Sequence, residues 1–252
     1  MYICAKFGAS VTLNCRLTAP SRFALFMKLT YYGHSCFLAE IGSTKVLFDP
    51  FIRPNELAKD IDVEKIEADF ILLSHGHGDH VADAEEIGKR TGAELVGMFE
   101  VLSWFEAKGL KANYKMNLGG KIKLPFGTVK LVPAAHSSSM PDGSYGGLAA
   151  GFVVETAEKN FYFAGDTALT YDMKLINERH ELDFAILPIG DNFTMGVDDA
   201  IEAANWVGVR QFIGMHYDTF PPIKIDHDAA REQATQAGKE LVLMAIGSTM
   251  EL

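Results

Sequence analysis

The stretch Ser74–His80 reads SHGHGDH and places three histidines and one aspartate within seven residues. His75 and His77 alternate, so in an extended segment their side chains point the same way. The intervening glycines permit sharp turns between them, and Asp79 suits the start of the helix expected next. Imidazole and carboxylate groups at this density are typical ligands of a borderline divalent cation. A solvated polar loop is the alternative, and the density of the cluster argues against it.

The apolar segment just before this cluster, DFILLS over 69–74, predicts a central strand buried on both faces. Other apolar segments also run into His or Asp, and the seven such positions are His34, Asp49, His75, His136, Asp166, Asp191 and His216. In layered α/β proteins, ligands bind outside the ends of strands. Each residue alone could cap a turn. The set indicates a site, because the chain has only 8 histidines and five occur at His75, His77, His80, His136 and His216.

Apolar patterning along the rest of the chain predicts an α/β fold in one layered domain, with sheets packed together and helices outside. Strands are expected over 28–33, 36–41, 45–50, 69–74, 94–98, 121–124, 128–132, 148–155, 160–165, 183–189, 211–215 and 241–246. Helices are expected over 99–109, 170–180, 198–207 and 226–237. The segments 121–124 and 128–132 read as one hairpin, and 148–155 and 160–165 as another.

Composition narrows the classes of partner. The chain has 252 residues and a net charge of −10, which argues against extended nucleic-acid binding. No uncharged apolar run approaches the ~20 residues of a membrane helix. Three cysteines, Cys4, Cys15 and Cys36, form no CxxC pair, which favours a reducing, cytoplasmic compartment. We expect a small-molecule substrate and no membrane partner, and a homo-oligomer stays open.

Residues 1–26 contain Lys6, Arg16 and Arg22 and no acidic residue. A targeting segment is one reading, because transit peptides are basic and poor in acidic residues. We favour an extension upstream of the natural start, because Met27 opens a first strand and no apolar core or cleavage site precedes it. The expected domains are an extension over 1–26 and a folded domain over 27–252.

Several motifs carry a resemblance to a known family. HGHGDH (75–80) matches the H-x-H-x-D-H signature of the metallo-β-lactamase superfamily, and AAHSSS (134–139), FAGDT (163–167) and GMHY (214–217) follow in that superfamily's order. MKLTYYGHSCFL (27–38), LFDPF (47–51) and PIGDNFTMG (188–196) resemble the UPF0173 metal-dependent hydrolases, close to an ascorbate-6-phosphate lactonase-like branch. The resemblance implies a four-layer αββα sandwich over 27–252.

The same resemblance implies two divalent metal ions. It assigns His75, His77 and His136 to one ion, Asp79, His80 and His216 to the second, and Asp166 to a bridge between them. The family implies zinc, although Mn²⁺, Fe²⁺ and Ni²⁺ also suit nitrogen and oxygen ligands. The cysteines are not expected as ligands, and Cys36 is expected to pack in a strand.

Charge and metal chemistry together predict a hydrolase. Five neutral imidazoles, two carboxylates, two divalent cations and a hydroxide sum to about +1, which favours a small anionic or polarised substrate. A metal lowers the pKa of bound water to about 7. We therefore expect a metal-bound hydroxide to cleave an ester-type bond, such as a lactone or phosphodiester. Asp79 and Asp166 are the expected catalytic carboxylates. His34 is a further catalytic candidate, and a structural role for it is equally open.

Weaker candidates surround this set. Asp191, Asn192 and Tyr217 are candidates for binding substrate, although a polar loop or packing would also explain them. Asp49 would hold a ligand histidine or cap a turn. Two other functions stay open: a non-hydrolytic diiron redox protein, and a metal-stabilised binding domain of the same fold.

Overall fold

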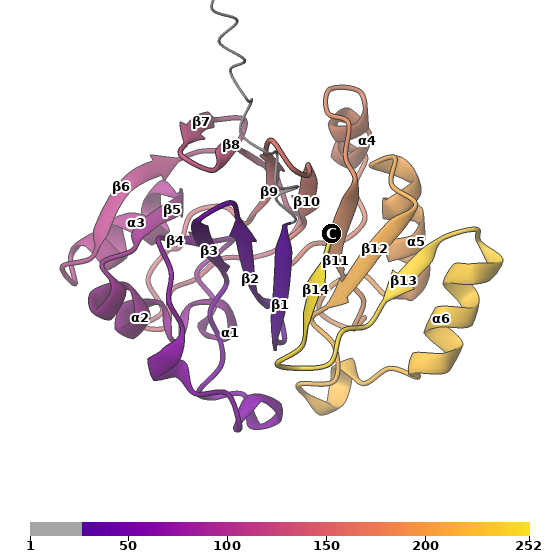
Figure 1. Ribbon diagram of the computed structural model, residues 1–252, viewed down its shortest axis with the longest axis horizontal. Helices are drawn as coiled ribbons and strands as arrows, with labels where there is room; N and C mark the ends of the chain where they lie inside the picture. The colour runs from indigo at the N-terminus through magenta and orange to yellow at the C-terminus, as the bar shows by residue number, and fades with distance from the viewer. Residues whose placement is uncertain (1–26) are drawn as a thin grey trace, which may run out of the picture.

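Two β-sheets face each other in the computed structural model, which describes residues 27–252 (Figure 1). The first sheet has the strand order β14 (Thr249–Glu251), β1 (Lys28–Gly33), β2 (Cys36–Ile41), β3 (Thr44–Phe48), β4 (Phe70–Leu73), β5 (Glu94–Met98) and β6 (Lys111–Met116). The second has the order β13 (Glu240–Val242), β12 (Gln211–Met215), β11 (Phe184–Pro188), β10 (Phe161–Phe163), β9 (Ala150–Glu155), β8 (Gly127–Pro133) and β7 (Lys121–Leu124). The expected extension over 1–26 lies outside the described residues.

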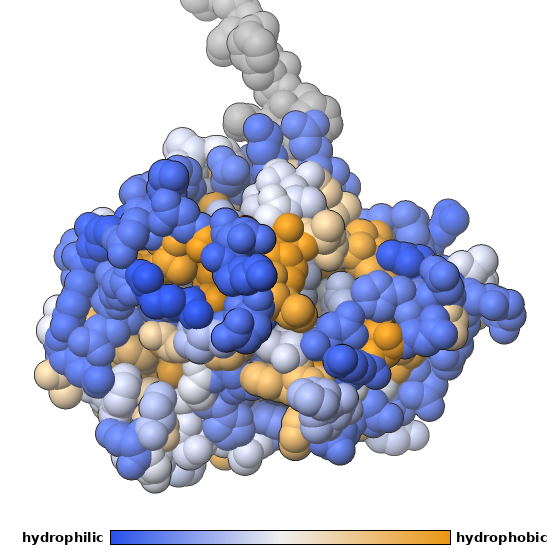
Figure 2. All heavy atoms as spheres, turned by 90° about the horizontal axis from the view of Figure 1, so that it is seen from below, coloured by the Kyte–Doolittle hydropathy of each residue, from blue (hydrophilic) through white to orange (hydrophobic). Residues whose placement is uncertain are grey.

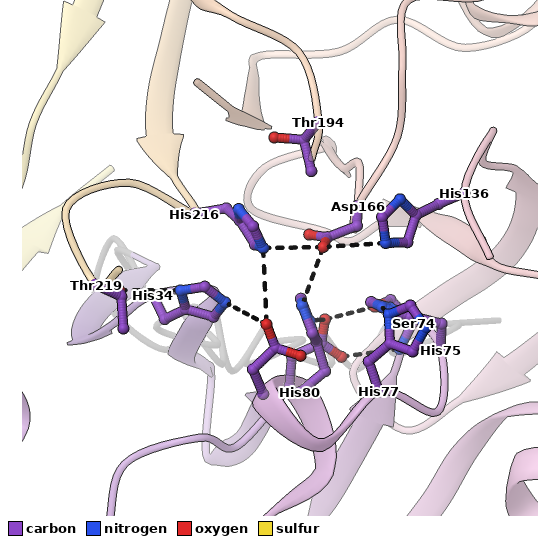
Figure 3. Close-up of polar contacts among 12 residues, drawn as sticks. His34, Ser74, His75, His77, His80, His136, Asp166, Thr194, His216 and Thr219 are labelled. Atoms are coloured by element: carbon purple, nitrogen blue, oxygen red, sulfur yellow. Dashed lines mark hydrogen bonds and ion pairs between the residues drawn. The ribbon is translucent and has the colours of Figure 1, made fainter. Parts of the chain in front are cut away.

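The two outer layers are formed by helices α2 (Ala84–Thr91), α3 (Phe99–Glu106), α4 (Asp172–Asn177), α5 (Val197–Trp206) and α6 (His227–Gln236). The short α1 (Gly78–Val81) lies at the lower end of the sandwich in Figure 1, and 3-10 turns occur at Glu56–Ala58, Val63–Lys65 and Pro221–Ile223. Helix α3 packs on β5 and β6, α5 on β11, and α6 on β13. Figure 1 shows α2 and α3 outside the first sheet and α4, α5 and α6 outside the second. This arrangement confirms the expected four-layer αββα sandwich.

Aromatic side chains from both sheets form the core between them. Phe48 of the first sheet stacks on Phe163 of the second, with ring centroids 4.9 Å apart. Phe152 meets Phe48 edge-on at 6.3 Å, and Phe37 meets Phe163 at 6.5 Å. All four rings are fully buried, and burying each stabilises the fold by about 1.5–3 kcal/mol. These contacts fix how the two sheets pack on each other. The strands that carry the site residues therefore end at the same end of the sandwich.

The structure confirms most of the expected strands and both hairpins. It differs from the expectation at the C-terminal end of the chain. Both expected hairpins pair antiparallel, and Cys36 is buried in β2 as expected. The strand expected over 241–246 is only Glu240–Val242. The chain then turns at Gly247, where φ is +82°, and returns as β14 beside β1 in the other sheet.

None of the helices within residues 27–252 combines the length and the apolar character that a membrane-spanning helix requires.

Candidate metal centre

The predicted ligands lie at the carboxyl ends of strands from both sheets, at the lower end of the sandwich in Figure 1. His34 follows β1, His75 follows β4, His136 follows β8, Asp166 follows β10 and His216 follows β12. The expected pattern of strands that run into His or Asp therefore converges on one end of the fold.

A glycine allows the signature loop to pack closely. A Cβ atom on Gly76 would lie 2.5 Å from the sulfur of Met140 and 3.0 Å from the carbonyl oxygen of Ser139. The Gly76 N–H instead donates to the Ser138 hydroxyl at 3.1 Å. Any side chain at this position would push the signature loop away from the segment that carries His136.

Three of the predicted ligands form a first group. The ring nitrogens of His75, His77 and His136 offer one ligand atom each, all within 4.8 Å of one another. His75 Nε2 lies 2.9 Å from His77 Nδ1. Burial holds the pKa of His75 well below its ordinary value and lowers the pKa of His77 and of His136. Near neutral pH the three imidazoles are therefore uncharged, which is the form that binds metals.

A second group lies beside the first, and Asp166 contacts both. Asp79, His80 and His216 have ligand atoms within 4.8 Å of one another. Asp166 Oδ2 is 2.9 Å from His216 Nε2 and 3.3 Å from His80 Nε2. It is also 3.5 Å from His136 Nε2 in the first group. Figure 3 shows Asp166 between His136 and His216, with the ring of His80 below the Asp166 carboxylate. The structure thus brings all seven predicted ligands together.

Three buried polar atoms in this cluster have no hydrogen-bond partner within residues 27–252: His80 Nε2, Asp166 Oδ1 and His216 Nδ1. Leaving such atoms unpaired costs about 1–3 kcal/mol each. Burial would raise the pKa of Asp166, but the His80 and His216 imidazoles hold it well below its usual range. Burial likewise would raise the pKa of Asp79, which the neighbouring His34 and His80 imidazoles lower. The buried Asp166 and the partly buried Asp79 are both held in ionised form beside imidazole nitrogens, which suits a divalent cation.

Asp49 orients the predicted ligand His80 through a hydrogen bond that it accepts from Nδ1, the ring nitrogen that faces away from Asp166. Its fully buried carboxylate accepts hydrogen bonds from His80 Nδ1 at 2.8 Å, from the Ser74 N–H at 2.8 Å and from the Ser74 hydroxyl at 2.5 Å. Because Asp49 holds a proton on Nδ1, Nε2 is the nitrogen that His80 turns toward Asp166. Such carboxylate–histidine pairs typically support metal ligands, and here the carboxylate contacts a ligand histidine as expected for Asp49.

Non-glycine residues at this end of the fold adopt left-handed backbone conformations. The φ angles are +54° at His34, +41° at Asp49 and +56° at His216. Each such residue costs about 1–3 kcal/mol, and strain of this kind concentrates at functional sites. The strain therefore marks the same place as the cluster of ligands.

A cavity of about 440 Å³ opens above the cluster. Its residues are His77, Asp79, His136, Ser137, Asp166, Phe193, His216, Phe220 and Pro222. Phe193, Phe220 and Pro222 give it an apolar wall, and none of its residues is a lysine or arginine. Figure 2 views this end of the molecule and shows hydrophobic residues in the middle of the face, between hydrophilic ones. The sequence did not predict this apolar wall, because Phe193 and Phe220 lie in loops without a periodic pattern.

The three residues expected to bind substrate lie elsewhere. Asp191 and Asn192 form a turn with φ angles of +58° and +55°, and this turn places Phe193 rather than either of them in the cavity. Asp191 lines a neighbouring hollow. Tyr217 points away from the cavity that His216 lines and is buried in a separate one behind His34. The structure does not bring Asp191, Asn192 and Tyr217 to the metal cluster.

Comparison with known proteins agrees with this geometry. Residues 44–217 match the family model for a beta-lactamase superfamily domain. A UPF0173 metal-dependent hydrolase of Christiangramia forsetii is 52% identical over 227 residues, which cover 90% of this chain and 100% of the relative. A UPF0173 metal-dependent hydrolase of Methylacidiphilum infernorum is 53% identical over 207 residues, covering 82% of this chain and 92% of the relative.

A solved structure is also similar over most of the chain. Igni18, described as a novel metallo hydrolase from Ignicoccus hospitalis, is 33% identical with a TM-score of 0.82, over 90% of this chain and 99% of Igni18. The finer expectation of an ascorbate-6-phosphate lactonase-like branch stays a prediction. On these matches and this fold, the chain belongs to the UPF0173 metal-dependent hydrolase family of the metallo-β-lactamase superfamily.

Proposed function

We propose that this protein hydrolyses an ester-type bond in a small substrate at a centre of two divalent metal ions, with zinc as the metal. The observation that carries the proposal is the position of Asp166. Its Oδ2 atom lies within 3.5 Å of His136 in one group of ligands and within 3.3 Å of His80 in the other. A carboxylate shared by two sets of nitrogen donors is the arrangement expected of a bridging ligand.

The residues divide into two ligand sets. His75, His77 and His136 would hold the first cation, Asp79, His80 and His216 would hold the second, and Asp166 would contribute to both sites. Cations bound there would supply a hydroxide near neutral pH and polarise an oxygen of the substrate. Asp49 keeps the proton of His80 on Nδ1, so that the metal-facing nitrogen stays free.

The cavity wall constrains the substrate. Among residues 27–252, no lysine or arginine lines the cavity. The positive charge beside it would therefore come from the metal ions, and we expect a single anionic or polarised group of the substrate to bind there. Phe193, half-exposed at 53%, and Phe220 offer apolar surface to the remainder. We therefore favour a small ester with one polar reacting group, in keeping with a lactone or phosphodiester, and with an apolar substituent.

The test is an anaerobic assay of zinc-reconstituted protein against a panel of lactones, phosphodiesters and thioesters. We expect turnover in at least one class, and its loss in Asp79→Asn and Asp166→Asn. Asp69→Asn is the matched control, because this exposed carboxylate accepts a hydrogen bond from the Lys45 N–H and lines neither the cavity nor the metal cluster, so its removal should leave turnover intact. Full metal occupancy with no turnover in any class would rule the proposal out and favour a binding domain.

A further inference from the structure

His34 is a buried imidazole beside the second group of ligands, outside the seven residues that the superfamily signature provides. It is 1% exposed. Its Nε2 atom lies 3.3 Å from Asp79 Oδ2, and its ring centroid lies 4.2 Å from that of His216. His34, Asp79, His80 and His216 each offer a ligand atom, and these four atoms lie within 4.8 Å of one another. Figure 3 shows His34 with one edge toward this group and the other toward Thr219.

The hydrogen bonds on the far side of the ring fix where its proton lies. His34 Nδ1 is 3.0 Å from the hydroxyl oxygen of Thr219, and that hydroxyl donates to the carbonyl oxygen of Tyr217 at 3.3 Å. Since the Thr219 proton is used there, its oxygen accepts, and His34 Nδ1 has to carry the donated proton. A neutral imidazole has only one N–H. The Nε2 lone pair of His34 therefore faces the Asp79 carboxylate, which also only accepts.

Two facing acceptors repel unless a positive charge lies between them. The His34–Asp79 spacing suits a metal ion, because ligand atoms 2.0–2.2 Å from a five-coordinate zinc lie about 2.8–3.8 Å apart where they subtend angles of 90–120°. The His34–Asp79 separation of 3.3 Å falls within this range, and the His216–Asp79 separation is slightly longer at 3.9 Å.

The backbone holds His34 in this position. Its φ angle of +54° is in the left-handed region, where a residue with a Cβ atom is strained. Its carbonyl oxygen accepts hydrogen bonds from the His216 N–H at 2.9 Å and from the Tyr31 hydroxyl at 3.1 Å. The residue is thus tied directly to the loop of another ligand, which opposes relaxation of the strain.

We infer that His34 is an additional ligand of the second metal ion and binds it through Nε2, together with Asp79, His80 and His216. The inference rests on the proposed metal centre. It assigns six of the chain's 8 histidines to metal binding and makes the second set richer in nitrogen than the signature implies. The competing reading is that His34 only orients Asp79, which requires the proton on Nε2 and a Thr219 hydroxyl turned to donate to Nδ1.

Long-range ¹H–¹⁵N spectra of the whole protein, labelled with [¹⁵N]histidine and loaded with two equivalents of Zn²⁺, separate these readings. They distinguish a protonated ring nitrogen from a metal-bound one at each histidine. His34→Gln assigns the His34 signals by their loss. Thr219→Val is the matched control, because it removes the partner of Nδ1 and leaves Nε2 untouched.

We expect six histidines with a metal-bound nitrogen, and His34 with its proton on Nδ1 in both the wild type and Thr219→Val. A proton on His34 Nε2 in the zinc-loaded protein, with five metal-bound histidines, would overturn the inference and leave the proposed function standing. Protein that binds no zinc at the cluster would overturn both. If His34→Gln fails to fold, the count of six or five in the wild type still decides.

Discussion

Replacing Asp49 by Asn tests how the fold prepares its ligands. The carboxylate accepts three hydrogen bonds while fully buried, two from Ser74 and one from His80. An amide has one acceptor oxygen, so at least one donor loses its partner whichever way the amide is turned. If the NH₂ group faces His80, the imidazole proton moves to Nε2, where the cation binds. Removing one side of such a buried charged contact costs about 3–5 kcal/mol of stability.

The metal should respond as well, because misplacing a supporting carboxylate lowers metal affinity about 10–100-fold. That change corresponds to about 1.4–2.7 kcal/mol. We would measure urea unfolding of the metal-free protein and zinc affinity by chelator competition. Asp69→Asn is the control: its exposed carboxylate accepts a 2.8 Å hydrogen bond from the Lys45 N–H, and we expect a loss below about 1.5 kcal/mol with unchanged zinc affinity. If Asp49→Asn bound zinc as tightly as the wild type, Asp49 would not support the metal ligand His80.

Three further predictions address the core, the titration of the site and the cavity wall. Phe48→Ala should lower the free energy of unfolding by about 3–5 kcal/mol, because this ring joins the two sheets; a loss below about 1 kcal/mol in urea unfolding would contradict it. The melting temperature of metal-free protein should fall from about pH 7.5 to about pH 5. Burial lowers the pKa of His34 to about 4 and also lowers the pKa of His75, His77 and His136. As the pH falls, these histidines therefore bind protons in the unfolded chain before they do so in the folded chain, which lowers the stability of the fold. His80, whose pKa is raised by the Asp166 and Asp49 carboxylates against the effect of burial, acts in the opposite direction, as do Asp49 and Asp83, whose pKa burial raises. We expect the four histidines to outweigh them, because the carboxyl groups begin to titrate only near the acid end of this range; a melting temperature that rises toward acid would show the sign to be wrong. Phe193→Ala should raise KM for aryl esters by about tenfold, the effect of about 1.4 kcal/mol of lost apolar contact, with little change for acetate esters of small alcohols; equal effects on both would remove Phe193 from the substrate contact.

The core of the site could be predicted from the sequence because its signal is local. The loop from His75 to His80 holds ligands close together in the chain, directly after a fully apolar strand. His136, Asp166 and His216 lie far from this loop in sequence. The strand-end pattern pointed to them, but their assignment to two metals came from the resemblance, and contact between them depends on how the two sheets pack.

Other features depend on three-dimensional packing and gave little local signal. Strand β14 has only three residues, and its pairing with β1 joins Thr30 and Thr249 through a 2.7 Å hydrogen bond between their hydroxyls. Such a contact leaves no pattern within a short window of sequence. Asp191 and Asn192 were expected to bind substrate, yet their left-handed turn presents Phe193 instead. The direction of a side chain in a loop follows from backbone angles that composition alone does not specify.

The most direct test of the account is an anomalous difference map from crystals of the zinc-loaded protein, recorded at the zinc absorption edge. We expect two peaks, one on each side of Asp166 Oδ2, the first among His75, His77 and His136 and the second among Asp79, His80 and His216. A single peak, or peaks away from Asp166, would contradict it.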